Sequence, residues 1–365
     1  MKQISILVIL IVVLSCNDRS IEASIETINL ADAIINPKHY IITKTDTKLV
    51  IDGIANETAW ANSKFTSKFI DIEGVKTPRY ETKVKMLWDD RYLYVYAKME
   101  EPHIWGDITK RDAIIYLNND FEVFIDPSQT GYGYGEIEIN ALNTVWDLYL
   151  DKPYRSGGKA NFHWNLNALK SAVYVDGSIN NPNKLDNFWA VEMAIPLKPF
   201  LNLKNRSKTS PIEGEQWKLN FSRVQWDFNI VDGKYQRKKE DGKFLPEYNW
   251  VWSNQKVINM HEPEKWGILQ FTEQTSTEGI IYNEDPDLLL KQVAYALYRE
   301  TKFKSLKFYL KQDVGTSKSL RVAYTKSDTL SAVFHKTNFG FEYVIESQIS
   351  NTTYSINEQG ILKTL

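Results

Sequence analysis

Apolar and polar residues alternate most strictly in the middle of the chain. In the segment 121–126 the odd positions hold Phe, Val and Ile, whereas the even positions hold Glu, Phe and Asp. A glycine-containing connection leads to the segment 136–141, which reads Glu-Ile-Glu-Ile-Asn-Ala and repeats the alternation. Because successive side chains of a strand point to opposite faces, the pattern predicts two antiparallel strands that share one apolar face and one acidic, amide-bearing face. Such a pair suits a packed core behind it and a polar ligand in front of it.

Shorter alternating runs lie on both sides of this pair. Gly, Pro and Asn separate the runs, and none of them shows a sustained helical period. Further strands are predicted at 40–51, 82–88, 92–99, 145–150, 188–195, 216–226, 249–252 and 267–271. The pattern therefore predicts an all-β fold, an antiparallel β-sandwich, over residues 40–273.

The segment 283–365 has a different character. All eleven tryptophans lie between Trp60 and Trp266, so this segment contains none. Asp285-Pro286-Asp287 precedes an apolar stripe that predicts a helix to about Lys302. Short alternating runs then predict a small antiparallel meander at 306–310, 320–324, 330–334, 341–345 and 354–356. We expect a separate C-terminal α+β unit, an accessory or docking module of unknown role.

The beginning of the chain has the pattern of a signal peptide, predicted over residues 1–15. Its apolar run, 4–14, is much shorter than the roughly 20 residues of a membrane-spanning helix. The run ends in Val-Leu-Ser before Cys16, the single cysteine, and this ending resembles the lipobox of bacterial lipoproteins. The resemblance implies lipidation of Cys16, a polar leader over 16–39, and a membrane-anchored, extracytoplasmic protein whose leaflet stays open. The alternative is an ordinary secretory signal with an incidental cysteine.

Length and charge narrow the possible classes. At 365 residues the chain exceeds the size at which a single core usually stops growing, which favours two folded units. The net charge of −2 and the pI near 6.3 give no basic field over the sequence. Nucleic acid is therefore not an expected partner.

An ordered series of short motifs extends from about residue 48 to 272. It comprises Ile-Asp-Gly at 51–53, Leu-Trp-Asp-Asp at 87–90, Glu-Val-Phe-Ile-Asp at 122–126, Glu-Ile-Asn-Ala at 138–141, Asn-Phe-Ser-Arg-Val at 220–224 and His-Glu-Pro-Glu-Lys-Trp-Gly at 261–267. Together these motifs resemble the family 9 carbohydrate-binding modules. The resemblance implies a β-sandwich that binds sugars without catalysis, often beside polysaccharide-degrading enzymes, and with calcium in some members.

The resemblance also implies where a sugar would bind. Sugar-binding members of the family clamp a terminal sugar between two tryptophans, and the nearest positions here hold Tyr116 and Met260. Glu122 matches the glutamate of the family's strand, while Glu138 stands where a sugar-contacting arginine is expected. Rings that could replace the clamp are Trp105, Tyr132, Tyr134, Trp250 and Trp252.

Aromatic rings and polar side chains together suit sugars, because C–H groups pack on a ring face while hydroxyls reach carboxylates and amides. The predicted binding residues are Tyr116, Glu122, Glu138, Asn140, Arg223, Trp250, Trp252 and His261. Arg223 is expected to pair with one of these carboxylates and to hold the site. His261 either fixes the turn before Pro263 or lines the site. For the tryptophans on strands, a place in the core is the competing interpretation.

Catalysis is a competing hypothesis for the same residues. Glu122 and Glu138 on adjacent strands could serve as the acid and the nucleophile of a glycoside hydrolase. The sequence has no Gly-x-Ser-x-Gly elbow, and the segment 261–265 has Lys where a zinc-protease motif needs its second His. No cofactor is predicted. Structural calcium could be held by Asp120, Asp126 or Asp147 with backbone carbonyls, although no EF-hand spacing is present.

Two functional hypotheses follow, with the hydrolase as a weaker third. The first is a surface-tethered lipoprotein that binds a poly- or oligosaccharide without cleaving it and supports a glycan-degrading enzyme or a transporter. The second is a structural or assembly lipoprotein that kept the fold without sugar binding. In both, the lipid on Cys16 would attach the protein to a membrane.

Overall fold

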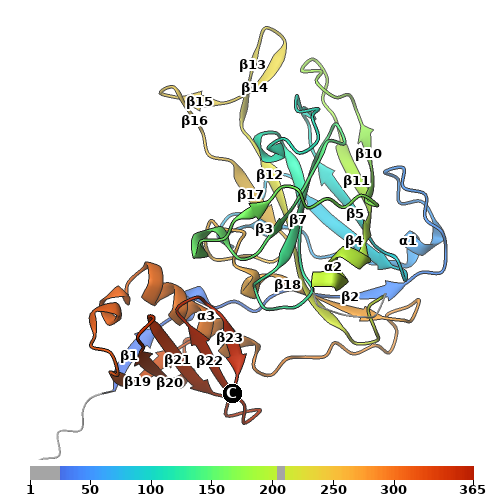
Figure 1. The fold of residues 1–365 in the computed structure, drawn as a ribbon. Coiled ribbons are helices and arrows are strands. Elements are labelled where there is room, and N and C mark those ends of the chain that lie inside the picture. Colours follow the sequence, from blue (N-terminus) through green and yellow to red (C-terminus); the bar gives the residue numbers. More distant parts are fainter. Residues whose placement is uncertain (1–24, 204–209) are drawn as a thin grey trace, which may run out of the picture.

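The computed structural model describes residues 25–203 and 210–365 (Figure 1). The predicted signal peptide and Cys16 lie outside the described residues. A larger body carries a thirteen-stranded sheet, and a smaller body carries a six-stranded sheet with the helix α3 (Leu288–Phe303). No helix in the described ranges has the length and apolar character needed to cross a membrane.

The larger sheet runs in the order β10-β11-β5-β4-β2-β18-β12-β6-β7-β8-β9, with β17 added on β12 and β3 on β17. Its strands are β2 (His39–Lys44), β3 (Ile70–Asp71), β4 (Thr82–Trp88), β5 (Tyr92–Glu100), β6 (Asp120–Asp126), β7 (Tyr134–Asn140), β8 (Val145–Leu150), β9 (Ala160–Asn161), β10 (Lys170–Asp176), β11 (Phe188–Pro196), β12 (Gln216–Gln225), β17 (Tyr248–Val251) and β18 (Gly267–Thr272). Two short hairpins project from it (Figure 1): β13 (Phe228–Val231) with β14 (Lys234–Arg237), and β15 (Lys239–Glu240) with β16 (Lys243–Phe244).

The prediction of an all-β fold is confirmed, but the sheet is mixed rather than wholly antiparallel. β2 pairs in parallel with both β18 and β4. The chain reaches β4 from β2 through the long segment 45–81, which includes the short helix α1 (Thr58–Asn62). Long connections of this kind allow parallel pairing, whereas a tight hairpin enforces antiparallel pairing.

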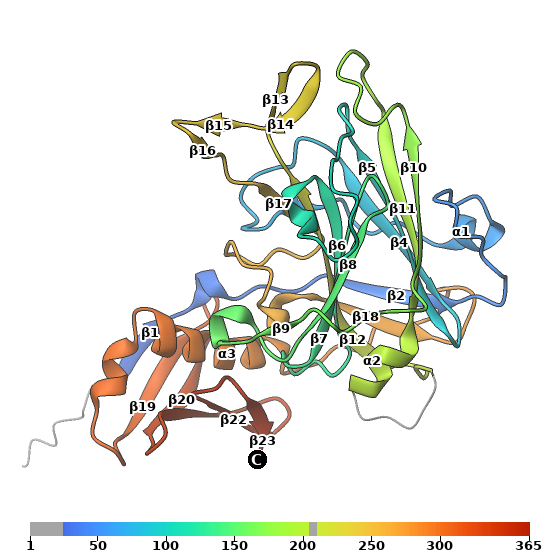
Figure 2. The ribbon, with the colours of Figure 1, turned by 45° about the horizontal axis from the view of Figure 1, so that its top comes forward.

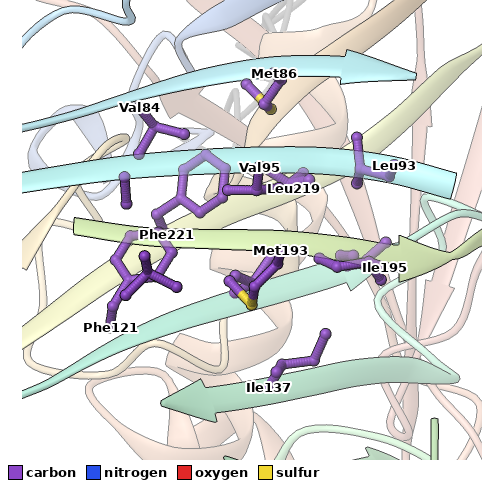
Figure 3. Packing of buried hydrophobic residues seen from close by; sticks show 14 of the residues in the cluster. Val84, Met86, Leu93, Val95, Phe121, Ile137, Met193, Ile195, Leu219 and Phe221 are labelled. Atoms are coloured by element: carbon purple, nitrogen blue, oxygen red, sulfur yellow. The ribbon is translucent and has the colours of Figure 1, made fainter. Parts of the chain in front are cut away.

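The main core lies where the curled sheet folds over itself. Side chains from β4, β5 and β11 meet side chains from β6, β7 and β12 (Figure 3), among them Val95, Met193, Phe121, Ile137 and Phe221. The helix α2 (Leu197–Leu203) closes one end of this core with Phe200 and Leu201. Burial of this much apolar surface is the main stabilising term of the larger body.

The smaller body contains a strand from the opposite end of the chain. Its sheet runs β1 (Glu26–Asn29), β19 (Ser317–Ala323), β20 (Thr329–Lys336), β21 (Phe341–Glu346), β22 (Thr353–Asn357) and β23 (Leu362–Thr364). The helix α3 lies against this sheet, and β1 lies beside β19 (Figure 2).

Two details of the sequence prediction fail in this body. The leader 16–39 is not wholly a linker, because β1 pairs in parallel with β19 and buries Ile28 in the same core as α3. The run 306–310 does not form a strand. It falls in the 3₁₀ helix η5 (Lys307–Lys311), where Tyr309 is buried. Both segments are too short for periodicity to decide their structure.

A buried ion pair joins the two bodies. The guanidinium of Arg299 on α3 donates from Nε and Nη2 to the two carboxylate oxygens of Glu264, at 2.8 and 3.0 Å. Glu264 belongs to the larger body, in the 3₁₀ helix η4 (Pro263–Lys265). Nearby, the Tyr295 hydroxyl donates to the carbonyl of Thr130, at 2.9 Å. These contacts fix α3 against the larger body with a bidentate, solvent-shielded geometry.

We expect Arg299→Met to lower the free energy of unfolding by about 3–5 kcal/mol, because it leaves the Glu264 carboxylate buried without its partner. Urea denaturation checks this. The matched control is Lys304→Met, directly after the end of α3, where the lysine is 56% exposed and its ion pair with Glu300 contributes less than about 1 kcal/mol. Equal losses in the two variants would contradict the assigned role of Arg299.

Candidate functional site

The strand register decides which side chains share the outer face of the sheet. Glu122 on β6 lies directly opposite Glu138 on β7, and Glu138 lies opposite Trp146 on β8. Residues opposite each other in adjacent strands point to the same face. Since Phe121 and Ile137 point into the main core, these three side chains point away from it.

A cavity of about 340 Å³ lies on this outer face. The strands of the sheet form the floor of the cavity. Its walls include two loops that contain the 3₁₀ helices η2 (Ile115–Leu117) and η3 (Tyr154–Ser156). The lining residues are Ile72, Tyr116, Glu122, Phe124, Glu136, Glu138, Trp146, Tyr154, Val224, Glu247, Asn249, Ile258, Asn259, Met260 and His261.

Carboxylates crowd one part of this cavity. Asp120, Glu122 and Glu138 are buried, and one oxygen from each lies within 4.8 Å of the others. Burial raises the pKa of Glu122 to about 7. Burial, and next the charge of Glu122, raise the pKa values of Asp120, Glu136 and Glu138 well above their ordinary range. Like charges held close together in a desolvated site disfavour simultaneous ionisation.

An aromatic rim faces the carboxylates. The backbone N–H of Tyr116 donates to Glu138 Oε2 at 3.0 Å, and its carbonyl accepts from the indole of Trp226 at 2.8 Å. The backbone of Tyr116 is thus held at both ends, while 39% of the residue stays exposed. Trp146 and Tyr154 are the other large rings of the lining. Within the described residues, the N–H of the buried Trp146 indole has no acceptor. The cavity therefore offers ring faces, a free donor and several acceptors.

His261 supports the rim. Its Nδ1 lies 2.9 Å from the Tyr134 hydroxyl, and its ring meets that of Tyr154 edge to face, with centroids 4.7 Å apart. Burial, and secondly the charge of Arg155, lower the pKa of His261 to about 4. The imidazole is consequently neutral near pH 7 and acts as a packed, hydrogen-bonded wall. His261 lines the cavity, and its side chain bonds to Tyr134 on β7 rather than to a group of the turn before Pro263.

Four of the predicted site residues meet in the cavity, namely Tyr116, Glu122, Glu138 and His261. Met260, at the second position of the family's clamp, also lines it. Asn140 does not. Its amide donates to the carbonyl of Ile108 at 2.8 Å, and its oxygen accepts from the backbone of Leu142 and Thr144. Asn140 therefore fixes the turn between β7 and β8.

The remaining predictions for site residues are corrected by the structure. Arg223 does not pair with a cavity carboxylate, because its Nη2 donates to Glu101 Oε2 at 2.8 Å instead. Trp250 and Trp252 are only 2% and 1% exposed and belong to the main core. They cannot offer a ring face to a ligand. The curled sheet covers their side of the strand, which a spacing of two residues alone does not reveal.

The replacement rings also differ from those expected. Trp105 and Tyr134 are buried, and the Tyr132 hydroxyl donates to the carbonyl of Gln359 in the smaller body. None of these rings is among the described lining of the cavity. Trp146 and Tyr154 line it instead. Trp146 was recoverable from the sequence, because a tight turn over 140–144 pairs position 146 with Glu138. Tyr154 lies in a non-periodic segment that carries no such signal.

Two of the three aspartates considered for calcium have other partners. Asp126 accepts the backbone N–H groups of Ser128, Gln129 and Gly131 at 2.8–3.0 Å. Asp147 pairs with Arg111 and accepts the N–H of Leu166. The carboxylates of Asp126 and Asp147 are thus already paired with protein groups, which leaves Asp120 as the remaining candidate for a calcium ligand.

Most of the larger body is similar to known proteins. Residues 51–274 match the model of the family described as carbohydrate family 9 binding domain-like. A family 9 carbohydrate-binding module from Caldicellulosiruptor kristjanssonii, solved in complex with cellotriose, is 16% identical, with a TM-score of 0.43, over 68% of this chain and 100% of that chain. Its complex with glucose gives 16% identity and a TM-score of 0.42 over the same shares. The comparison with curated proteins gave no match.

Acid should destabilise the protein partly through His261. Its folded pKa, about 4, lies below the ordinary value of 6.5, so its contribution is fully present above pH 6.5 and is lost as the pH falls through 4. Between pH 7 and pH 4, the free energy of unfolding should fall by up to about 3 kcal/mol more in the wild type than in His261→Asn.

Chemical denaturation at a series of pH values measures this difference. The comparison with His261→Asn cancels the opposite contribution of the cavity carboxylates, whose raised pKa values favour the folded state at low pH. Parallel pH profiles for the two proteins would show that His261 titrates normally.

Proposed function

The chain belongs to the carbohydrate family 9 binding domain-like proteins, and from that premise we propose that it binds a sugar without cleaving it in the cavity on the outer face of β6, β7 and β8. The main support for this proposal is that Tyr116 and Glu122 line the same cavity as Met260, which lies more than a hundred residues later in the sequence. Trp146 and Tyr154 add ring faces where a sugar needs them.

The chemistry of the lining fits sugar hydroxyls. Carboxylate oxygens of Glu122, Glu136 and Glu138 accept hydrogen bonds from hydroxyl groups, and the free indole N–H of Trp146 donates one. The backbone that carries the Tyr116 ring is held by two hydrogen bonds before any ligand arrives, which lowers the conformational entropy lost on binding. The volume of about 340 Å³ suits one or two sugar rings rather than the side of a long polymer.

Non-catalytic binding is favoured over hydrolysis by the electrostatics. A retaining glycosidase needs one carboxylate ionised as its nucleophile. Here burial raises the pKa values of both Glu122 and Glu138, which favours their protonated forms. Neither carboxyl therefore has the low pKa that keeps the nucleophile of such an enzyme ionised.

Replacing Tyr116 should weaken sugar binding. We expect Tyr116→Ala to reduce affinity at least about tenfold, a loss of about 1.4 kcal/mol, because a ring face on the rim is removed. The measurement is calorimetric titration with the sugars retained on a glycan panel that includes cello-oligosaccharides. The matched control is Tyr174→Ala, which removes a similarly exposed tyrosine from β10, outside the cavity lining.

Equal affinities of Tyr116→Ala and the wild type would place the sugar elsewhere. A wild type that retains no sugar on the panel, with calcium present and absent, would overturn the proposal. That outcome would favour a structural or assembly lipoprotein that kept the fold.

The proposal includes attachment to a membrane through a lipid on Cys16, outside the cytoplasm. It rests on the sequence 1–16, with its short apolar run before the single cysteine. A tethered sugar-binding protein would hold a glycan near a degrading enzyme or a transporter, since attachment raises the local concentration of the captured chain.

Substituting the cysteine tests this attachment. In a bacterial host, Cys16→Ser should abolish metabolic labelling with a fatty acid and release the protein from the membrane fraction, because the thiol that carries the lipid is lost. Fractionation with immunoblotting measures the release. Membrane association and labelling that persist in Cys16→Ser would contradict the lipid anchor.

A further inference from the structure

The acidic part of the cavity has the composition of a cation site. One oxygen from each of Asp120, Glu122 and Glu138 lies within 4.8 Å of the other two, and the residues are 0%, 5% and 2% exposed. They come from adjacent strands, β6 and β7, whose register is set by the core on the other face. The cluster is therefore a rigid feature of the sheet and not a chance meeting of flexible side chains.

In the described part of the chain, no Lys or Arg side chain pairs with this cluster. Among the described residues that line the cavity, none is Lys or Arg. Arg223, on the neighbouring strand β12, is occupied by Glu101, Gln225, Thr82 and the carbonyl of Glu100. The three carboxylates thus lie together without the cation that usually accompanies buried acids.

A second observation is independent of the crowding. Within the described residues, neither oxygen of the fully buried Asp120 has a well-formed hydrogen bond, and the backbone N–H of Val224 only partly offsets the rise in the pKa of this carboxyl. The buried Ser222 hydroxyl, on β12 directly opposite Glu122, faces that carboxyl as a hydrogen-bond donor and supplies no donor to Asp120. Buried polar atoms are nearly always satisfied, and an absent ion is one of the few explanations for several unsatisfied oxygens in one place.

We propose that Asp120, Glu122 and Glu138 bind one divalent cation of the calcium class. Calcium takes oxygen ligands at 2.3–2.6 Å, so ligands on opposite sides of the ion stand up to about 5 Å apart, which covers the spacing of this cluster. Magnesium demands near-ideal octahedral geometry and usually keeps several of its waters, which a buried set of three carboxylates favours less. Zinc prefers nitrogen and sulfur ligands, which the cluster lacks.

The ion would stand at the cavity wall, because Glu122 and Glu138 are part of the lining while Asp120 lies behind them. Three carboxylates leave coordination positions open for hydroxyl groups, since calcium takes six to eight ligands. Glu138 also accepts the N–H of Tyr116, so an ion on Glu138 and the aromatic rim share one residue. Sugar binding should therefore depend on calcium, a consequence that rests on the function proposed above.

The first experiment measures the metal alone. Calcium is titrated calorimetrically, at pH 7.5, into the chelator-treated protein from residue 17 onward. Terbium(III), which substitutes for calcium, is titrated in parallel, with its luminescence sensitised by Trp146, the register partner of Glu138. We expect one bound ion per chain, and at least a tenfold loss of affinity in Asp120→Asn and in Glu138→Gln.

Glu247→Gln is the matched control, because Glu247 lines the same cavity but lies outside the three-carboxylate cluster. Thermal unfolding of each variant without metal verifies that it folds. Absence of binding to the wild type, or the same calcium affinity in Glu138→Gln and Glu247→Gln, would overturn the proposed site. Protons alone would then account for the cluster.

The second experiment separates the ion from the sugar. The sugar retained by the wild type is titrated in calcium and in chelator. Calcium binding with at least a tenfold loss of sugar affinity in chelator would support both the site and its role. Calcium binding without any sugar binding would support the metal site and overturn the proposed function. Equal sugar affinity in calcium and in chelator would overturn the calcium dependence and leave the sugar site standing.

Discussion

The alternation of β6 and β7 is the constraint on which the site depends. Phe121, Val123 and Ile137 fill the main core, so Glu122 and Glu138 must point to the outer face. A slip of one residue in the pairing would turn the carboxylates into the core and the apolar side chains into the cavity. The packing of the core thus holds together acidic side chains whose ionised forms repel each other. Because the core fixes the register of the strands, these side chains stay on the cavity side of the sheet.

The acidity of the cavity also depends on the separation of Arg223 from the cavity carboxylates. Arg223 and Ser222 are neighbours on β12, yet they point to opposite faces of the sheet. The guanidinium is enclosed by Glu101, Gln225 and backbone oxygen, and it lies 5.1 Å from the centre of the Trp250 ring. One strand therefore carries a fully paired cation on its inner face and presents no cation to the cavity. A paired arginine inside the core stabilises the sandwich without neutralising the site.

The sequence was most informative where alternation was strict. It predicted most of the strands of both bodies, although not β10, and it predicted the helix α3 and the acidic outer face of β6 and β7, because periodicity reports which face is buried. It did not reveal that the curled sheet buries Trp250 and Trp252, since burial on a strand depends on what covers it. Nor did it find Tyr154, which lies in a loop, or the strand β1, whose partner β19 is almost three hundred residues away. Contacts of that range leave no local pattern.

The lack of a Lys or Arg among the described lining residues limits which ligands the cavity can accept. A sugar that carries carboxylate or sulfate groups would meet Glu122, Glu136 and Glu138 in a partly desolvated space, where it finds no cation and is repelled by any of these carboxyls that is ionised. A neutral sugar meets several acceptors and the free indole N–H of Trp146 for its hydroxyl groups, and the rings of Tyr116 and Trp146 bury its apolar face. A divalent ion on the carboxylates would reduce this repulsion and also replace lost hydration with fixed ligands. The sugar that the cavity accepts therefore depends on whether an ion occupies the carboxylate cluster, because the ion changes the net charge that the sugar meets.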